Sequence, residues 1–169
     1  RADSVFKGLL KIREQLTQAL GEVEGEQYLP KTWVMVHDAA RPGLTTRELE
    51  DFISYVWDHA PKTGAIMALP AQDTIKQVEK GKITTTLERE RIWLAQTPQM
   101  VRFNDLYLGT QKALAAGVNV TDEASILEYN GIFPAVYPGK PHNFKITYPN
   151  DLDLMRLIIE HRKSEKKRR

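Results

Sequence analysis

A carboxylate and a guanidinium, Asp38 and Arg41, stand just after the apolar run 33–36, which reads WVMV. A short run with two valines is typical of a strand that is covered on both faces, as in a parallel sheet. Ligands bind beyond the carboxyl ends of the strands in such sheets. Asp38 and Arg41 are therefore candidate ligand-binding residues. The alternative is a structural ion pair within a loop.

Three further side chains could meet a ligand. Lys145 interrupts the apolar segment 144–147, which is predicted to be a short strand. A lysine there usually carries its amine to the surface, but near a cleft it could bind an anion. Thr121 opens the segment TDEAS, which is typical of a helix N-terminus, so its hydroxyl could cap a helix or bind a substrate. Ser4 is placed to cap the first helix, or its hydroxyl could face a ligand.

Composition excludes several classes of protein. The chain has 169 residues, of which 41% are hydrophobic, and this is enough apolar material for one globular core. The net charge of +2 gives no support for nucleic-acid binding, because most of the excess lies in the basic tail 162–169, which we expect to be solvated and frayed. The absence of cysteine excludes disulfides, thiolate zinc sites and cysteine nucleophiles. The histidines lack the spacing of metal ligands, so no protein-bound metal is expected.

Targeting signals are also missing from the sequence. No apolar run approaches the roughly 20 residues of a membrane-spanning helix, and no secretory signal opens the chain. We therefore expect a soluble, cytoplasmic protein. The chain opens on Arg1 without an initiator methionine, so we expect the natural protein to begin earlier.

The elements expected around these residues form an α/β fold. Strands are predicted at the apolar runs 33–36 and 65–69, and shorter ones at 133–137 and 144–147. A strand, a helix and a strand between residues 33 and 69 make a right-handed βαβ unit. The helices are predicted from Ser4, after the capping-box spacing of Thr45 and Glu48, over 104–116 and from Asn150, and a loop is predicted over 21–31.

Residues 74–94 differ from the rest of the chain. Apolar residues are sparse there, Gly81 lies in a polar turn, and the β-prone run 84–86 follows it, which predicts a β-hairpin projecting from the body. A two-stranded hairpin is only marginally stable in water, so we expect it to pack against the same hairpin of a second copy in a twofold dimer. The alternative is a mobile surface loop.

Five segments together resemble the 2-C-methyl-D-erythritol 4-phosphate cytidylyltransferases in order and spacing. They are VHDAARP at 36–42, ALPAQDT at 68–74, QTPQ at 96–99, TDEAS at 121–125 and NFKITYPNDL at 143–152, and the opening RADSV matches as well. The resemblance implies a Rossmann-like, mostly parallel sheet flanked by helices, with the hairpin as a dimerisation arm. It also implies transfer of CMP from CTP to the phosphate of methylerythritol phosphate, with release of pyrophosphate, in non-mevalonate isoprenoid synthesis. Magnesium (Mg²⁺), held mainly by the CTP phosphates, is the implied cofactor.

The same resemblance implies roles for single residues. Lys145 and Arg89 correspond to the catalytic cations that position the substrate phosphate against the α-phosphorus of CTP. Thr74 and Arg89 bracket the hairpin, which in this family reaches into the active site of the partner subunit, so a homodimer would be part of the chemistry. Ser4 corresponds to a cytosine contact, and Ala39 lies where the backbone meets the nucleotide ribose. The implied substrate-binding set is Asp38, Arg41, Thr74, Thr97 and Thr121.

One motif of that family is missing from this sequence. Its glycine-rich nucleotide loop, Pro-Ala-Ala-Gly-x-Gly-x-Arg, occurs nowhere in the 169 residues, and side chains are poor substitutes for the backbone N–H groups of such a loop. We therefore expect residues 1–169 to be the C-terminal two-thirds of a single nucleotidyltransferase domain and to be inactive alone. Two alternatives stay open: a cytidylyltransferase for another polyol phosphate such as ribitol 5-phosphate, and a non-catalytic dimeric binding or assembly protein if the chain truly starts at Arg1.

Overall fold

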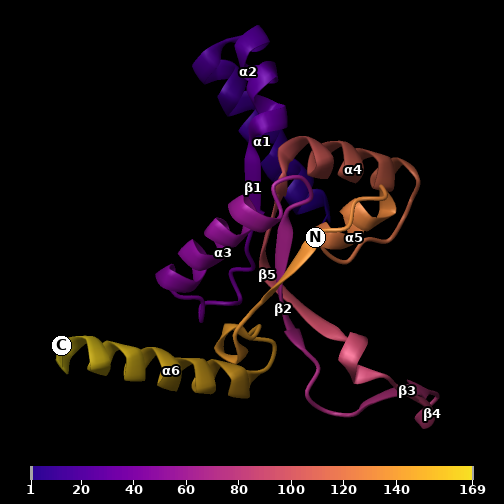
Figure 1. Ribbon diagram of the computed structural model, residues 1–169, viewed down its shortest axis with the longest axis vertical. Coiled ribbons are helices and arrows are strands. Elements are labelled where there is room, and N and C mark those ends of the chain that lie inside the picture. The colour runs from indigo at the N-terminus through magenta and orange to yellow at the C-terminus, as the bar shows by residue number, and fades with distance from the viewer. Residues whose placement is uncertain (1, 169) are drawn as a thin grey trace.

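The computed structural model describes residues 2–168, and a four-stranded sheet forms its centre (Figure 1). The strands, in spatial order, are β1 (Trp33–Val36), β5 (Trp93–Arg102), β2 (Ala65–Pro70) and β6 (Ala135–Pro138). β5 pairs antiparallel with β1 and with β2, whereas β2 and β6 are parallel. β1, β2 and β6 therefore run in one direction and β5 runs against them. The predicted α/β fold with a mostly parallel sheet is confirmed, because three of the four strands run in the same direction.

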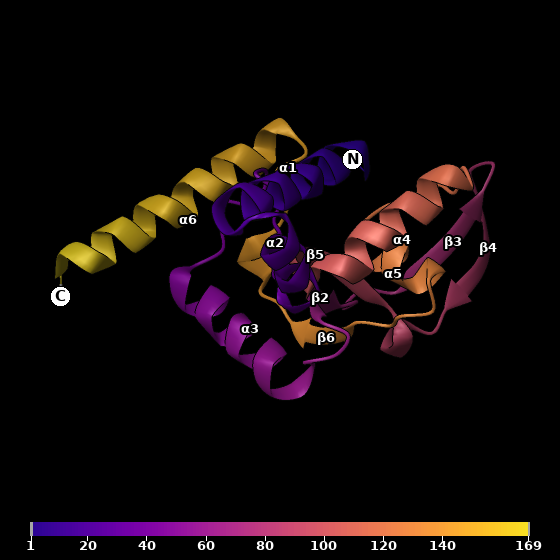
Figure 2. The same cartoon turned by 90° about the horizontal axis from the view of Figure 1, so that it is seen from above.

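Helices cover both faces of the sheet, as Figures 1 and 2 show. Side chains of a strand alternate between the two faces, and along β1 Val34 packs with one hydrophobic cluster while Trp33 and Met35 pack with the other. The second cluster contains the fully buried Phe52 of α3, and the first contains the fully buried Phe103 of α4. These helices are α3 (Thr46–His59) on one face and α1 (Ala2–Leu20), α4 (Phe103–Ala115) and α5 (Glu123–Tyr129) on the other.

β5 extends through a segment in which the sequence pattern predicts no strand, because polar residues and Pro98 occupy its middle. The Thr97–Pro98 peptide bond is cis. The register with β2 shifts between Ile66 and Ala68, so residues 96–98 bulge out of the ladder. Bulges re-aim side chains, and this one lies beside the end of β1. It therefore determines which way the hydroxyl of Thr97 points.

β1, α3 and β2 form the predicted strand-helix-strand unit, with β5 inserted between its two strands. The predicted capping box is confirmed: the Thr45 hydroxyl accepts a hydrogen bond from the Glu48 amide, and the Glu48 carboxylate accepts one from the Thr45 amide. Both orphan donors at the helix start are satisfied in this way.

Replacing Thr45 by alanine is expected to lower the free energy of unfolding by about 1 kcal/mol, because the Glu48 amide loses its acceptor. Urea unfolding of the two proteins measures this difference. Thr46→Ala is the matched control, because Thr46 is the exposed first residue of α3 and is not the capping residue. Equal losses in the two variants would contradict the capping role.

The prediction of a loop over 21–31 is wrong. The segment folds into α2 (Glu22–Tyr28) and the 3-10 turn η1 (Leu29–Lys31). Gly21 separates α2 from α1 with a φ of 85°, and a Cβ on Gly25 would lie 3.0 Å from the Thr17 backbone. α2 thus packs closely on α1 through a glycine, and local sequence signals do not reveal such a contact between helices.

Three predictions near the C-terminus are also wrong. Residues 144–147 form no strand, whereas the short strand predicted at 133–137 is present as β6 at 135–138. The last helix, α6 (Pro149–Arg168), begins before Asn150, and Asp151 rather than Asn150 accepts the amides of Thr147 and Tyr148 at 2.9 and 2.8 Å. The helix also continues through the basic tail to residue 168, although we expected that tail to be frayed, while residue 169 lies outside the described residues.

α6 is the longest helix of the described chain and extends away from the sheet in Figure 1. Its far end is tied to the body where Arg162 donates to the Gly43 carbonyl at 2.7 Å. None of the helices within residues 2–168 combines the length and the apolar character that crossing a bilayer requires.

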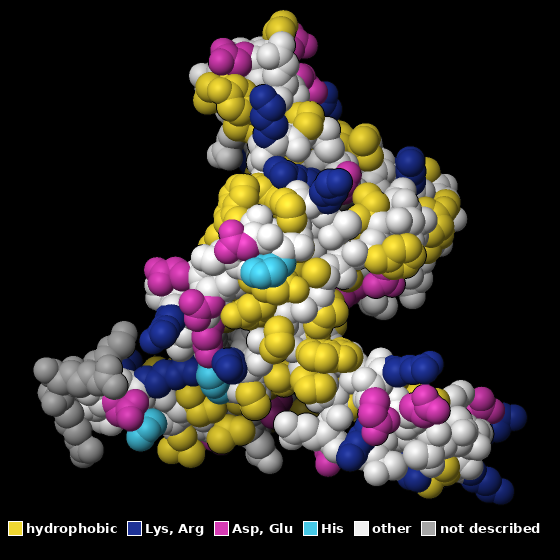
Figure 3. All heavy atoms as spheres, in the orientation of Figure 1, with side chains coloured by type: hydrophobic (Ala, Val, Ile, Leu, Met, Phe, Trp, Pro, Cys, Tyr) yellow, Lys and Arg dark blue, Asp and Glu magenta, His cyan; other side chains and the backbone are white. Residues whose placement is uncertain are grey.

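The segment predicted to be a hairpin contains β3 (Ile75–Glu79) and β4 (Lys82–Leu87), which pair antiparallel in a separate two-stranded sheet. Lys80 and Gly81 form the turn with φ values of 50° and 78°, as two-residue hairpin turns require. Apolar Val78 and Ile83 are 54% and 64% exposed, and the hairpin end of the molecule carries charges of both signs in Figure 3. Its role as a dimerisation arm stays a prediction.

Candidate active site

The loop after β1 is fixed by its own backbone and by the bulge of β5. The Arg41 amide donates to the Asp38 carbonyl at 2.9 Å, which closes a tight turn. The Asp38 amide donates to the hydroxyl of Thr97, also at 2.9 Å. Three predicted site residues, Asp38, Arg41 and Thr97, are therefore brought together at the carboxyl end of β1.

Two cations flank the Asp38 carboxylate. Arg41 Nε and Lys145 Nζ each lie 3.5 Å from Asp38 Oδ2. The side chains of Arg41 and Asp38 are only 12% and 16% exposed, whereas that of Lys145 is 48% exposed. Lys145 is the cation of this cluster that is most available to an incoming anion.

Arg41 is held in place from several sides. Its NH1 group donates to the Asn143 carbonyl at 2.9 Å, and its NH2 group reaches the Ala95 carbonyl at 3.4 Å. These bonds hold the positive charge of the guanidinium in one place beside Asp38, and a guanidinium is a group that suits phosphate.

Lys145 reaches the cluster from a loop and not from a strand. The Ile146 amide donates to the Ala40 carbonyl at 2.8 Å and fastens this loop to the turn after β1. The fully buried Asn143 holds the loop from beneath, because its side-chain amide donates to the Thr97 carbonyl at 2.8 Å. The strand predicted at 144–147 is wrong, but Lys145 nevertheless lies beside Asp38.

Thr121 lies next to the start of α5, but it is not the cap. Asp122 is the N-cap and accepts from the Ser125 amide at 2.9 Å, while the Thr121 amide donates to the Ser125 hydroxyl. Thr121 is exposed, so its hydroxyl is not occupied by the capping role that we predicted.

Gln99 connects the start of α5 to the rest of the site, and sequence reasoning did not single it out. Its side-chain amide donates to Asp122 at 2.9 Å and accepts from the Ala124 amide at 2.9 Å, and the residue is 1% exposed. The only signal in the sequence was its place in the polar segment 96–99. A buried glutamine of β5 that bonds to two groups at the N-terminus of α5 fixes the position of that N-terminus relative to β5.

The two predicted nucleotide contacts lie in α1 and in the turn after β1. Ser4 is exposed within α1, which begins at Ala2, so Ser4 is not its cap. With Val36 and His37 it lines a groove of about 360 Å³ between α1 and β1. Ala39 is exposed in the turn after Asp38. The groove therefore leads to the edge of the charged cluster.

Thr74 and Arg89 are not brought into this cluster in the single chain. Both are exposed at the base of the hairpin. Arg89 donates to the Gln72 carbonyl at 2.7 Å, and its Nε lies 3.8 Å from Glu90. The hairpin projects away from the sheet in Figure 1.

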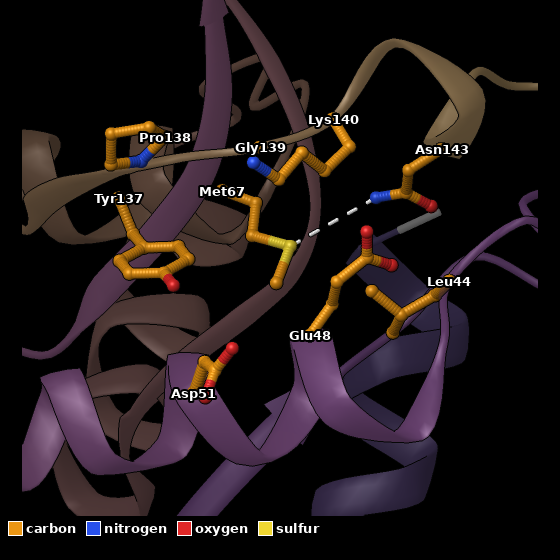
Figure 4. Close-up of a pocket in the computed structure, with 9 residues that line it drawn as sticks. All are labelled: Leu44, Glu48, Asp51, Met67, Tyr137, Pro138, Gly139, Lys140 and Asn143. Atoms are coloured by element: carbon orange, nitrogen blue, oxygen red, sulfur yellow. Dashed lines mark hydrogen bonds between the residues drawn. The ribbon is translucent and has the colours of Figure 1, made fainter.

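A small cavity of about 90 Å³ lies between α3 and the end of β6 with the segment that follows it, and Figure 4 shows its lining residues. At its edge the Glu48 carboxylate pairs with His142 Nε2 at 2.7 Å. Burial raises the pKa of Glu48, but the hydrogen bonds from Thr45 and the charge and hydrogen bond of His142 outweigh it. The pKa of Glu48 therefore lies below its ordinary value.

The lowered pKa of Glu48 predicts a loss of stability in acid. A carboxyl whose pKa is lower in the folded than in the unfolded state stabilises the fold above its unfolded pKa, and this contribution disappears as the pH falls through the folded pKa. Urea unfolding at neutral and at acidic pH should show a smaller acid-induced loss for Glu48→Gln than for the wild type. Glu50→Gln, an exposed position of the same helix, is the control and should follow the wild type. Identical acid losses in all three proteins would contradict this role of Glu48.

Within residues 2–168, no group of three or more histidine, aspartate and glutamate side chains is placed to hold a metal ion. Asp38, the carboxylate of the cluster, is already engaged by two cations.

The comparisons with known proteins agree on one family. The sequence profile of 2-C-methyl-D-erythritol 4-phosphate cytidylyltransferase matches residues 1–161. The enzymes of that name from Pseudomonas aeruginosa (strain UCBPP-PA14) and Vibrio atlanticus are both 41% identical to this chain, over 95% and 96% of it. In each case the chain spans 64% of the relative's own length.

Solved structures give the same picture. A crystal structure of 4-diphosphocytidyl-2C-methyl-D-erythritol synthase aligns with a TM-score of 0.74 at 34% identity, and covers 94% of this chain and 66% of that one. The Francisella tularensis 2-C-methyl-D-erythritol 4-phosphate cytidylyltransferase aligns with a TM-score of 0.67 at 39% identity, over 75% of this chain and 58% of that one. The chain belongs to the 2-C-methyl-D-erythritol 4-phosphate cytidylyltransferase family.

Proposed function

We propose that the protein to which these residues belong transfers CMP from CTP to 2-C-methyl-D-erythritol 4-phosphate and releases pyrophosphate, in the non-mevalonate synthesis of isoprenoid precursors. The observation that carries this proposal is the cluster of Lys145, Arg41 and Asp38 at the carboxyl end of β1, with both cations 3.5 Å from one carboxylate oxygen. Family membership supports the reaction class, since the relatives bear the name of this activity.

The cluster suits the acceptor half of the reaction. The phosphate oxygen of the polyol attacks the α-phosphorus of CTP, and the bond to pyrophosphate breaks. Such a transfer asks the protein mainly for positioning and for positive charge around the phosphates. Lys145 would hold the attacking phosphate, with Arg41 as a fixed second donor. Asp38 can accept from polyol hydroxyls, and the exposed Thr121 would offer a further hydroxyl, whereas the buried Thr97 would act by holding the Asp38 amide.

Groups outside the cluster complete the proposed site. Ser4 and the backbone of Ala39 would contact the nucleotide along the groove beside β1. Thr74 and Arg89 would come from the hairpin of a partner subunit, so we propose a homodimer. Magnesium neutralises charge on the nucleotide when it is bound, and we propose that the CTP phosphates supply most of its ligands. We further propose that the protein works in the cytoplasm.

The test is an assay of the full gene product with CTP and magnesium. Pyrophosphate release should depend on methylerythritol phosphate, and ribitol 5-phosphate, offered in parallel, should give little. Release with ribitol 5-phosphate alone would replace the proposed acceptor, and no release with either would overturn the proposed activity. Residues 1–169 assayed alone should release little pyrophosphate, because the glycine-rich nucleotide loop of the family is not among them.

A further inference from the structure

His37 is the last residue before the charged turn, and both of its ring nitrogens are engaged. Nδ1 lies 3.0 Å from the Thr97 hydroxyl, and Nε2 lies 3.0 Å from the Arg41 carbonyl. The imidazole thus joins the bulge of β5 to the far end of the turn 38–41. The ring lines the groove beside β1, but none of the roles described above rests on its two hydrogen bonds.

The partners of the ring favour a proton on Nε2 and none on Nδ1. A carbonyl oxygen can only accept, so Nε2 carries the proton and donates to Arg41. Thr97 Oγ1 already accepts from the Asp38 amide, which leaves its own hydrogen free to be donated to Nδ1. The bonds then form one continuous chain: the Asp38 amide to Thr97, Thr97 to His37, and His37 to the Arg41 carbonyl.

We propose that His37, as the neutral ring protonated on Nε2, is a positioning residue that fixes the turn carrying Asp38 and Arg41. The turn has only one internal backbone bond of its own, from the Arg41 amide to the Asp38 carbonyl. The imidazole holds the turn at both ends. It bonds to Thr97, which accepts from the Asp38 amide, and it donates directly to the Arg41 carbonyl. Because the cations of the cluster are useful only when their spacing is fixed, this tie sets the affinity for the acceptor phosphate. This consequence for affinity rests on the proposed function.

The first test is independent of activity. Nitrogen-15 NMR of the labelled full gene product should show His37 protonated on Nε2 and unprotonated on Nδ1 at neutral pH. Thr97→Val removes the donor to Nδ1 and should shift that resonance, whereas Thr97→Ser keeps the hydroxyl and should leave it close to the wild-type position. A proton on Nδ1, or a resonance unmoved by Thr97→Val, would overturn the assigned chain of bonds.

The second test separates substrate affinity from catalysis. His37→Ala should raise KM for methylerythritol phosphate by about tenfold, the effect of losing one to two hydrogen bonds, and should change kcat by less than this. His37→Asn can replace the acceptor at Nδ1 and His37→Gln the donor at Nε2, so each should recover part of the loss. His161→Ala, at an exposed position of α6, is the control.

The outcomes of these tests distinguish the positioning role of His37 from the proposed enzymatic activity. Equal KM values for His37→Ala and the wild type would refute the positioning role, even with the predicted tautomer. A gene product inactive with both polyol phosphates would overturn the proposed function, while the NMR experiment would still decide the tautomer and the bond to Thr97. If His37→Ala fails to fold, the asparagine and glutamine variants and the NMR experiment still decide the role of the ring.

Discussion

Lys145→Ala is expected to lower kcat of the full gene product by a factor on the order of 10², because the transferring phosphate loses a positioned cation. The fold should be unaffected, since the Lys145 side chain is 48% exposed and Asp38 retains Arg41 as a partner. Steady-state pyrophosphate release measures the change, and circular dichroism verifies the fold.

Two matched variants sharpen this experiment. Lys145→Arg keeps the charge but changes its shape and should retain part of the rate. Lys62→Ala removes an exposed lysine from the turn after α3 and should leave the rate unchanged. A near-normal rate for Lys145→Ala would remove Lys145 from the proposed chemistry and leave Arg41 as the only cation beside Asp38.

Arg89→Ala is expected to lower kcat by a similar factor, on the order of 10², although Arg89 lies away from the cluster within one chain. The reason is the proposed arrangement in which the hairpin of one subunit completes the site of the other. Arg91→Ala is the control, because Arg91 is also exposed at the hairpin base. Steady-state kinetics of the two variants would show whether the effect belongs to this one position.

Mixing the two inactive variants tests the shared site directly. In a dimer of one Lys145→Ala subunit and one Arg89→Ala subunit, one site has both cations and the other has neither. After subunit exchange in equal amounts, about one quarter of the wild-type rate should return, since half of the dimers are mixed and each holds one intact site. If no rate returns although mixed dimers form, Lys145 and Arg89 act within the same subunit.

Local sequence signals were sufficient to predict the elements that are specified by residues close together in the chain. The α3 helix was predicted because Thr45 and Glu48 cap each other, and β1 because four apolar residues stand together. The α2 helix was missed because its stability depends on Gly25 approaching α1. Residues 144–147 have the composition of a strand, but they are held by the Ile146–Ala40 bond and by Asn143, and they join no ladder.

The residues of the charged cluster could be chosen from the sequence, but the bonds that connect them could not. Asp38 and Arg41 could be found from their place after an apolar run, and Lys145 and Thr121 were candidates from their local patterns, whereas Thr97 came from the resemblance. Residues that link the members were missed, as Gln99 and Asn143 show. The partners of Gln99 at the start of α5 lie 23 and 25 residues away in the chain, and Asn143 bonds to Thr97 and Arg41 from 46 and 102 residues away. A single sequence does not show such pairings.

The immobility of Arg41 has a consequence for substrate choice. Fixing a long, flexible side chain costs up to about 2 kcal/mol of conformational entropy, and here the Asn143 and Ala95 carbonyls have imposed that ordering during folding. In the proposed reaction the acceptor phosphate would therefore meet a guanidinium whose direction is already determined. Compounds whose anionic group arrives at another angle would gain little from it, so the stiffness of one arginine would act as a geometric filter on the acceptors of the proposed reaction.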